Sequence, residues 1–164
     1  SAARSSRCWS SSVVKSIFVV ILVDGLFARI GGAILHVDLG SDIEAQVKHN
    51  IRAIVAVLLD EPKLTRILLS YAPGLDPEFG AKIQSFYAGV KMLLKESLSE
   101  GQELGIVAPG DASVYATFTL GAMKEILFEN VSGAATRPRE QIVEDLFALL
   151  QRGYLRVDGD AHPP

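Results

Sequence analysis

The feature that most constrains this fold is the spacing of its apolar residues, which follows the helical period almost from end to end. Between Val13 and Arg156, apolar side chains recur at intervals of three and four residues, and no stretch alternates apolar and polar residues over the length of a strand. A chain of 164 residues is long enough for one domain with a continuous core. The sequence therefore predicts an all-α bundle of about six helices.

Residues that cap or break helices indicate where each predicted helix begins and ends. Ser41 and Glu44 have the spacing of a capping box. Pro62 and Pro77 each suit the first turn of a helix, where the missing backbone N–H has no partner to lose. We expect helices over about 15–36, 41–60, 62–71, 77–100, 112–130 and 138–154.

The stretch GIVAPGDAS, residues 105–113, has the glycine spacing of a phosphate-binding loop. Gly105 and Gly110 are correctly spaced, but Asp111 stands where that motif requires lysine, and its carboxylate would repel a phosphate. A phosphate loop also follows a β-strand, whereas an amphipathic helix is predicted before this stretch. We therefore interpret it as a helix–helix connection in which Asp111 caps the following helix.

Charge and cysteine content exclude several classes of protein. A net charge of −3 with a pI near 5.6 argues against a surface dedicated to nucleic acid. Cys8 is the only cysteine, so the chain cannot form an internal disulfide. The apolar run at residues 17–23 is too short to cross a membrane, and no small-residue cleavage site follows it. We expect a cytoplasmic protein with no membrane partner.

The last two predicted helices are apolar around a wide arc. With 49% apolar residues and a mean hydropathy of +0.28, the chain has hydrophobic surface to hide. One face of each helix would pack in the core and the other against a second copy, as a four-helix dimer interface. The alternative is that both are interior helices of one compact bundle. The predicted interface residues are Val114, Phe118, Gly121, Val143, Phe147, Leu150 and Tyr154.

Several segments occur in an order that resembles a known family. They are DGLFARIGGAI, LLDEPKLTRILLSYAPG, the stretch from GLDPEFG through EGQELGI to LGAMKEILFE, and the closing EDLFALLQRGYL. Over residues 15–156, their order and spacing resemble the C-terminal domain of TetR/AcrR-type transcriptional regulators. The resemblance implies an all-α domain that dimerises through its last two helices and encloses a small-molecule pocket among the middle ones. In such regulators the effector shifts a DNA-binding helix-turn-helix off its operator.

The N-terminal segment departs from that family. A helix-turn-helix should precede the residues KSIF, but only the Ser- and Arg-rich residues 1–14 stand there, too few for two helices and a supporting third. We expect 1–14 to be a disordered or foreign leader, 15–156 to be the ligand-binding and dimerisation domain, and 157–164 to be a flexible tail. DNA would then be bound only through a domain that residues 1–14 cannot form.

No residue pattern predicts catalysis or a metal site. His36, His49 and His162 are far apart in the sequence, and neither His-Glu-x-x-His nor paired cysteines occur. The Gly-x-Ser-x-Gly motif of serine hydrolases does not occur either. We expect no enzyme activity, no cofactor and no bound metal.

A pocket for a small hydrophobic effector is the remaining functional prediction. Asn50 lies on the apolar stripe of its helix, between Val47 and Ile54, and needs a hydrogen-bond partner that is either backbone or ligand. Aromatic and apolar residues of later helices could line a cavity, although each could also be ordinary core or interface packing. The candidates are Asn50, Tyr71, Phe86, Tyr87, Val90, Tyr115, Thr119 and Met123.

These expectations lead to one functional interpretation and one alternative. The chain is predicted to be the ligand-sensing and dimerisation domain of a TetR/AcrR-like regulator without its DNA-binding head. The alternative is a stand-alone helical dimer module that binds small molecules and has no part in transcription. A helix-turn-helix encoded just upstream would favour the first, and its absence would favour the second.

Overall fold

Six α-helices form the described structure, in the predicted order. The computed structural model describes residues 6–70 and 77–157, with side chains over 20–70 and 80–157. The described residues contain no β-strand, only an isolated antiparallel bridge between Val107 and Leu155. The all-α class is therefore confirmed. The helices are α1 (Ser6–Ala33), α2 (Ile43–Asp60), α3 (Pro62–Ser70), α4 (Pro77–Glu103), α5 (Ala112–Ser132) and α6 (Arg139–Gly153).

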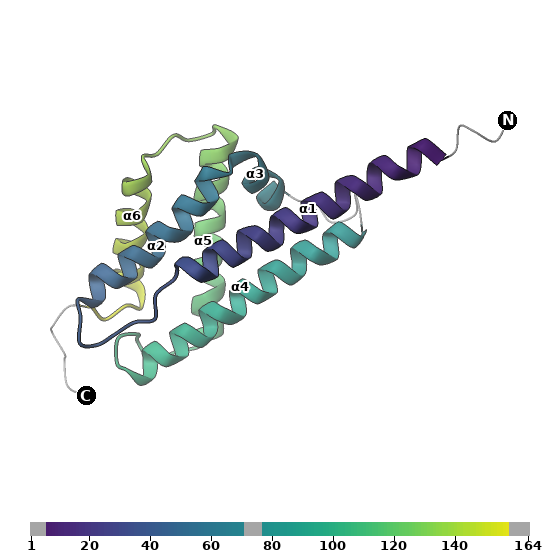
Figure 1. Ribbon diagram of the computed structural model, residues 1–164. Helices are drawn as coiled ribbons and strands as arrows, with labels where there is room; N and C mark the ends of the chain where they lie inside the picture. The colour runs from purple at the N-terminus through teal and green to yellow at the C-terminus, as the bar shows by residue number, and fades with distance from the viewer. Residues whose placement is uncertain (1–5, 71–76, 158–164) are drawn as a thin grey trace.

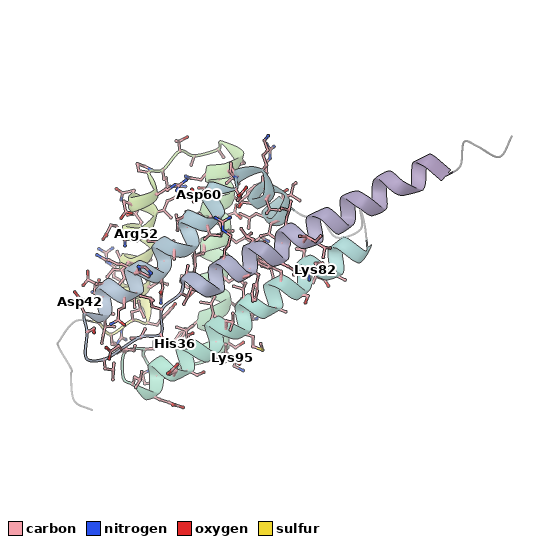
Figure 2. All side chains as sticks on the ribbon, viewed as in Figure 1. His36, Asp42, Arg52, Asp60, Lys82 and Lys95 are labelled. Atoms are coloured by element: carbon pink, nitrogen blue, oxygen red, sulfur yellow. The ribbon has the colours of Figure 1, made fainter. Side chains whose placement is uncertain are left out.

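The six helices pack around one shared core. The long helices α1 and α4 lie side by side, and α1 projects beyond the rest of the bundle (Figure 1). Lys82 of α4 lies at their seam, where its ammonium is 2.6 Å from the Asp24 carboxylate of α1 (Figure 2). Helix α5 packs against α3 and α4, and α2 packs against α6 and α1. Although α5 and α6 are consecutive, they make few direct contacts.

Apolar side chains from all six helices meet in the core. Thr65 of α3 is a polar residue within it, at 0% exposed, and its hydroxyl donates to the Leu58 carbonyl at 2.5 Å. This bond satisfies the buried hydroxyl and joins α3 to the end of α2. The most deeply buried apolar residues are Val23, Leu26, Val55, Leu68, Leu127, Ile142, Val143 and Leu146.

The capping predictions are confirmed at α3 and α5 and wrong at α2. Pro62 is the first residue of α3. Asp111 caps α5, because its Oδ1 accepts from the Ser113 N–H at 2.8 Å, so residues 105–111 are the helix–helix connection that we predicted. At α2 the cap is Asp42, which accepts from the Ala45 N–H at 3.0 Å. Ser41 instead donates its hydroxyl to Asp38.

Two helices extend beyond their predicted bounds. Helix α1 begins at Ser6, so residues 6–14, for which we expected a disordered or foreign leader, are helical; this stretch has no glycine or proline to stop a helix. Helix α4 continues through Gly101, where a Cβ would lie only 2.7 Å from Val107 Cγ2. That glycine permits close packing rather than ending the helix. Residues 1–5 and 158–164, which contain most of the predicted tail, lie outside the described residues.

Candidate functional site

Asn50 is held by the backbone of its own chain. Its Oδ1 accepts from the Leu35 N–H at 2.8 Å, and its Nδ2 donates to the Leu35 carbonyl, also at 2.8 Å. The two bonds fix the segment after α1 against α2. Of the two alternatives for Asn50, the backbone partner is therefore confirmed.

Three aromatic rings on α1 and α4 form the candidate site that best matches a pocket wall. The rings of Phe27 and Phe86 meet edge to face with centroids 5.7 Å apart, and those of Phe86 and Tyr87 do so at 5.5 Å. Val90 lies one turn further along α4, and all four side chains are half-buried. We call Phe27, Phe86 and Tyr87 the aromatic cluster. It offers a partly open apolar surface between two helices.

The polar end of Tyr87 is turned towards α3. Its hydroxyl donates to the Leu68 carbonyl at 3.2 Å, and the Lys124 ammonium lies 5.1 Å from the centroid of its ring. Burial raises the pKa of Tyr87 to about 12. With its hydroxyl bonded to Leu68, Tyr87 presents its ring rather than its polar end to the cluster.

Alkaline unfolding should report on Tyr87. Its pKa is about 12 when folded against 10.0 when free, so its contribution to stability is full below pH 10 and is lost as the pH rises towards 12. We expect Tyr87→Phe to lose less stability than the wild type across this window, measured by urea unfolding at several pH values. Tyr154, whose pKa burial also raises, is present in both proteins and cancels. Equal losses would contradict the buried state of Tyr87.

Two of the candidates on α5 contact Tyr154 at the end of α6. Tyr115 stacks on Tyr154, with ring centroids 4.7 Å and planes 15° apart, and its hydroxyl donates to the Pro109 carbonyl at 3.0 Å. Thr119 Oγ1 is 2.6 Å from the Tyr154 hydroxyl, and Met123 is in the core. Tyr115 and Thr119 are thus both engaged with Tyr154. Tyr71 lies outside the described residues.

The predicted interface residues divide by helix. On α5, Val114 is 59% exposed, Phe118 is 56% exposed, and Gly121 is exposed as well. The predicted interface residues of α6 face inward, because this helix packs against α2. There the Lys48 ammonium lies 4.8 Å from the centroid of the Phe147 ring. The α6 assignment is therefore wrong, since residues at most 7% exposed have no surface to offer a partner. These core residues are Val143, Phe147, Leu150 and Tyr154.

Leu149 is the exposed apolar residue of α6 that sequence reasoning missed. It is 51% exposed and lies on an open groove of about 400 Å³ between α5 and α6. The charges of Asp145 and Arg152 flank it in the sequence and mark the outward edge of the helix. The groove is lined by Ile126, Arg137, Ile142, Asp145, Ala148, Leu149 and Arg152.

The exposed row of α5 runs into this groove. Phe118, Ala122 and Ile126 follow at intervals of four residues, so they lie on one side of the helix, and the last of them lines the groove. We call Val114, Phe118, Ala122, Ile126 and Leu149 the α5/α6 face. It is a partly exposed apolar surface that spans two helices.

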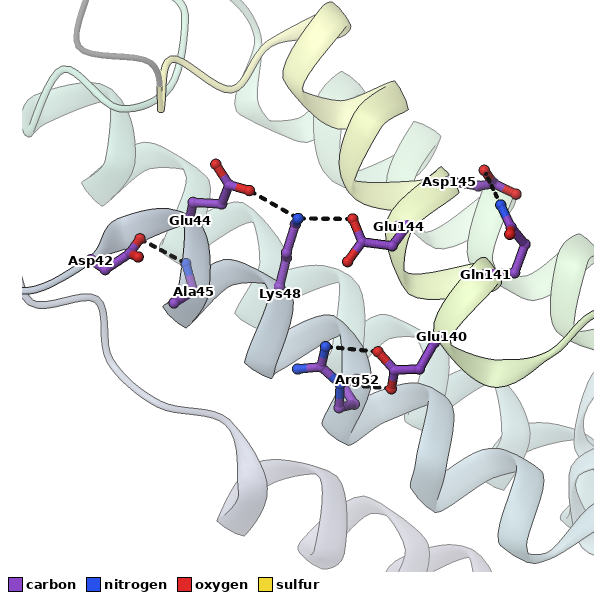
Figure 3. Close-up of polar contacts among 9 residues, drawn as sticks. All are labelled: Asp42, Glu44, Ala45, Lys48, Arg52, Glu140, Gln141, Glu144 and Asp145. Carbon is purple, nitrogen blue, oxygen red and sulfur yellow. Dashed lines mark hydrogen bonds and ion pairs between the residues drawn. The ribbon is translucent and has the colours of Figure 1, made fainter.

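Ion pairs hold the opposite edge of α6 to α2 (Figure 3). The Arg52 guanidinium donates to both Glu140 oxygens, at 2.8 and 2.9 Å, and the Lys48 ammonium is 2.8 Å from Glu144. The hydrogen bonds from Arg52 lower the pKa of Glu140. Exposed pairs of this kind contribute little stability one by one. In this arrangement Glu140 and Glu144 face α2 and Asp145 points away from it (Figure 3).

The described part of the chain offers neither a metal cluster nor a membrane span. No three His, Cys, Asp or Glu side chains there are grouped to hold a metal ion. Across the same residues, no helix combines the length and apolar character that a membrane span requires.

Comparisons of the chain with protein-family models, with curated proteins and with solved structures find no match.

Proposed function

We propose that this chain dimerises through α5 and α6 and senses a small hydrophobic effector, as the ligand-binding domain of a TetR/AcrR-like regulator does. The observation that carries the proposal is the α5/α6 face, on which Val114, Phe118 and Leu149 are each more than half exposed. A contiguous apolar surface on a folded domain typically marks an interaction site. This one lies on the last two helices, where the resemblance places a subunit interface.

The effector part of the proposal rests on the aromatic cluster. Its rings are half-buried between α1 and α4, and the Tyr87 hydroxyl is already bonded to Leu68. Small-molecule sites are mostly apolar, with few polar groups to set orientation. The cluster therefore suits a neutral, hydrophobic molecule, and this role requires neither catalysis nor a cofactor.

The dimer is tested by Phe118→Glu. A carboxylate placed in an apolar interface would be buried without a partner, so we expect the variant to be monomeric by sedimentation at micromolar concentration. Its helical content should be unchanged, because Phe118 is 56% exposed in the subunit.

Met92→Glu is the matched control, since Met92 is also 56% exposed but lies on α4. This variant should sediment as the wild-type dimer does. A monomeric wild type would contradict dimerisation itself. A dimeric Phe118→Glu variant would remove α5 from the interface.

The effector is tested by thermal shift with a panel of neutral hydrophobic compounds. A ligand present at about 100 times its Kd adds about 2.7 kcal/mol to the stability of the folded state, and so raises the Tm. Phe86→Ala should reduce the shift because it removes the central ring of the cluster, whereas Phe118→Ala should retain it. Equal shifts in both variants would place the site elsewhere, and no shift with any compound would contradict a neutral hydrophobic effector.

A further inference from the structure

The charged side chains of α6 divide into two sets. Three of them bridge to α2, with partners Asp60, Arg52 and Lys48. The other two, Asp145 and Arg152, form no ion pair among the residues that the structure describes. They are therefore available on the edge of α6 that faces away from α2. The full set on the helix is Arg139, Glu140, Glu144, Asp145 and Arg152.

These two charges flank an apolar centre. Ala148 and Leu149 lie between Asp145 and Arg152, and all four side chains line the groove between α5 and α6. Asp145 and Arg152 are almost two full helical turns apart, so they share one edge of the helix about 10 Å from each other. The order along this edge is acid, apolar, apolar, base.

We propose that two copies of the chain pair along this edge, with the two α6 helices antiparallel and the two-fold axis beside Ala148 and Leu149. This pairing rests on the proposed dimerisation and specifies its geometry. Asp145 and Arg152 are equally far from that axis, so the two-fold rotation places Asp145 of each subunit opposite Arg152 of the other. The apolar residues then meet at the centre.

The charges select both the direction and the register of the pairing. A parallel arrangement in the same register would set each Asp145 against its own copy and each Arg152 against its own copy, which is repulsive at both ends. A shift of one helical turn would separate both opposite-charge pairs. Only the antiparallel register centred between residues 148 and 149 satisfies both charges in both subunits.

The atoms needed for these pairs are in place. Asp145 Oδ1 accepts from Gln141 Nε2 at 2.9 Å, one turn back on the same helix, which holds the carboxylate at the outer edge (Figure 3). A carboxylate accepts at both oxygens, so Oδ2 can take a guanidinium N–H from the partner. Leu149 beside the small Ala148 gives the centre a large and a small side chain, which interdigitate when the helix is paired with its own copy.

The test exchanges the two charges. Each of D145R and R152D replaces two attractions across the axis with two repulsions, so we expect each variant alone to weaken the dimer by about tenfold or more in Kd. The double variant D145R/R152D restores opposite charges and should dimerise as the wild type does. Mixing the two single variants should give heterodimers, because one subunit then carries two basic groups and the other two acidic ones.

Native mass spectrometry of the mixture and sedimentation of each variant provide the measurements. Lys95→Asp and Glu96→Arg, at exposed positions on α4, are the controls that change net charge in the same way away from α6. Neither control should alter the dimer. Circular dichroism should show that each variant remains folded.

The outcomes separate this pairing from dimerisation in general. A wild type that is monomeric at every concentration overturns both. A wild-type dimer whose single charge variants dimerise unchanged, or mix at random, overturns the antiparallel α6 pairing and leaves dimerisation standing. Weakened single variants with a restored double variant and preferred heterodimers support the pairing.

Discussion

Replacing Phe147 with alanine is expected to lower the free energy of unfolding by about 3–5 kcal/mol, because it removes an aromatic ring from a close-packed core. Phe147 is 3% exposed and is covered on one side by Lys48, whose ammonium lies 4.8 Å from the ring centroid. Urea unfolding followed by circular dichroism measures the loss. Because the ring is internal to one subunit, the loss should be the same at every protein concentration.

Phe118→Ala is the matched control, since it removes the same atoms from a position that is 56% exposed. In dilute solution, where subunits are separate, we expect it to change stability by no more than about 0.5 kcal/mol. At higher concentration it should reduce stability by weakening the dimer. If both variants lost the same stability in dilute solution, Phe147 would not be the core residue that the structure describes.

Replacing Tyr154 with alanine should cost a similar amount, about 3–5 kcal/mol, and for a distinct structural reason. The side chain is 4% exposed, its ring stacks on Tyr115, and its hydroxyl lies 2.6 Å from Thr119 Oγ1. The backbone on either side is tied to the α4–α5 connection, through Ala108 N–H to the Tyr154 carbonyl at 2.7 Å. The ring therefore anchors the end of α6 to the start of α5.

Tyr154→Phe separates the ring from the hydroxyl. We expect it to cost only about 0.5–1.5 kcal/mol, the net contribution of one hydrogen bond. Thr119 keeps a partner in this variant, because its Oγ1 also donates to the Tyr115 carbonyl at 2.8 Å. Chemical unfolding of both variants gives the comparison. A loss in Tyr154→Phe as large as in Tyr154→Ala would mean that the hydroxyl, and not the stacked ring, holds the chain end.

Helix starts could be predicted from the sequence wherever one local residue decides them. Pro62 and Asp111 do so, since a fixed φ or a capping carboxylate acts within its own turn. At α2 two capping residues are adjacent, and Asp38, which bonds both the Gly40 N–H and the Ser41 hydroxyl, leaves the cap to Asp42. That preference depends on a loop conformation, which the spacing of the capping box does not reveal.

The orientation of α6 could not be predicted, because it depends on residues that are distant in the sequence. The helix is apolar around a wide arc, and periodicity alone does not show which of its apolar residues stays outside the core. In the structure, Arg52 and Lys48 of α2 pair with Glu140 and Glu144, and both apolar rows of the helix are largely buried. The outcome places Phe147 inside and leaves Leu149 outside.

The contacts of the predicted ligand residues could not be predicted from the sequence either. Their residue types suited a pocket, but type does not decide which side chains meet. Tyr115 stacks on Tyr154, and Thr119 lies within hydrogen-bond distance of its hydroxyl. Asn50 is hydrogen-bonded to the backbone of Leu35. What the sequence lacked was any indication that Phe27 of α1 would join Phe86 in an edge-to-face pair.

The projection of α1 has a mechanical consequence. At 28 residues and about 1.5 Å per residue, the helix is about 40 Å long, and its N-terminal end projects beyond the rest of the bundle (Figure 1). A tilt of about 5° around the part seated in the bundle would swing the end at Ser6 through about 2–4 Å over a helix of this length. A small change in the angle of α1 within the bundle would therefore displace its N-terminal end by several times more than its seated part.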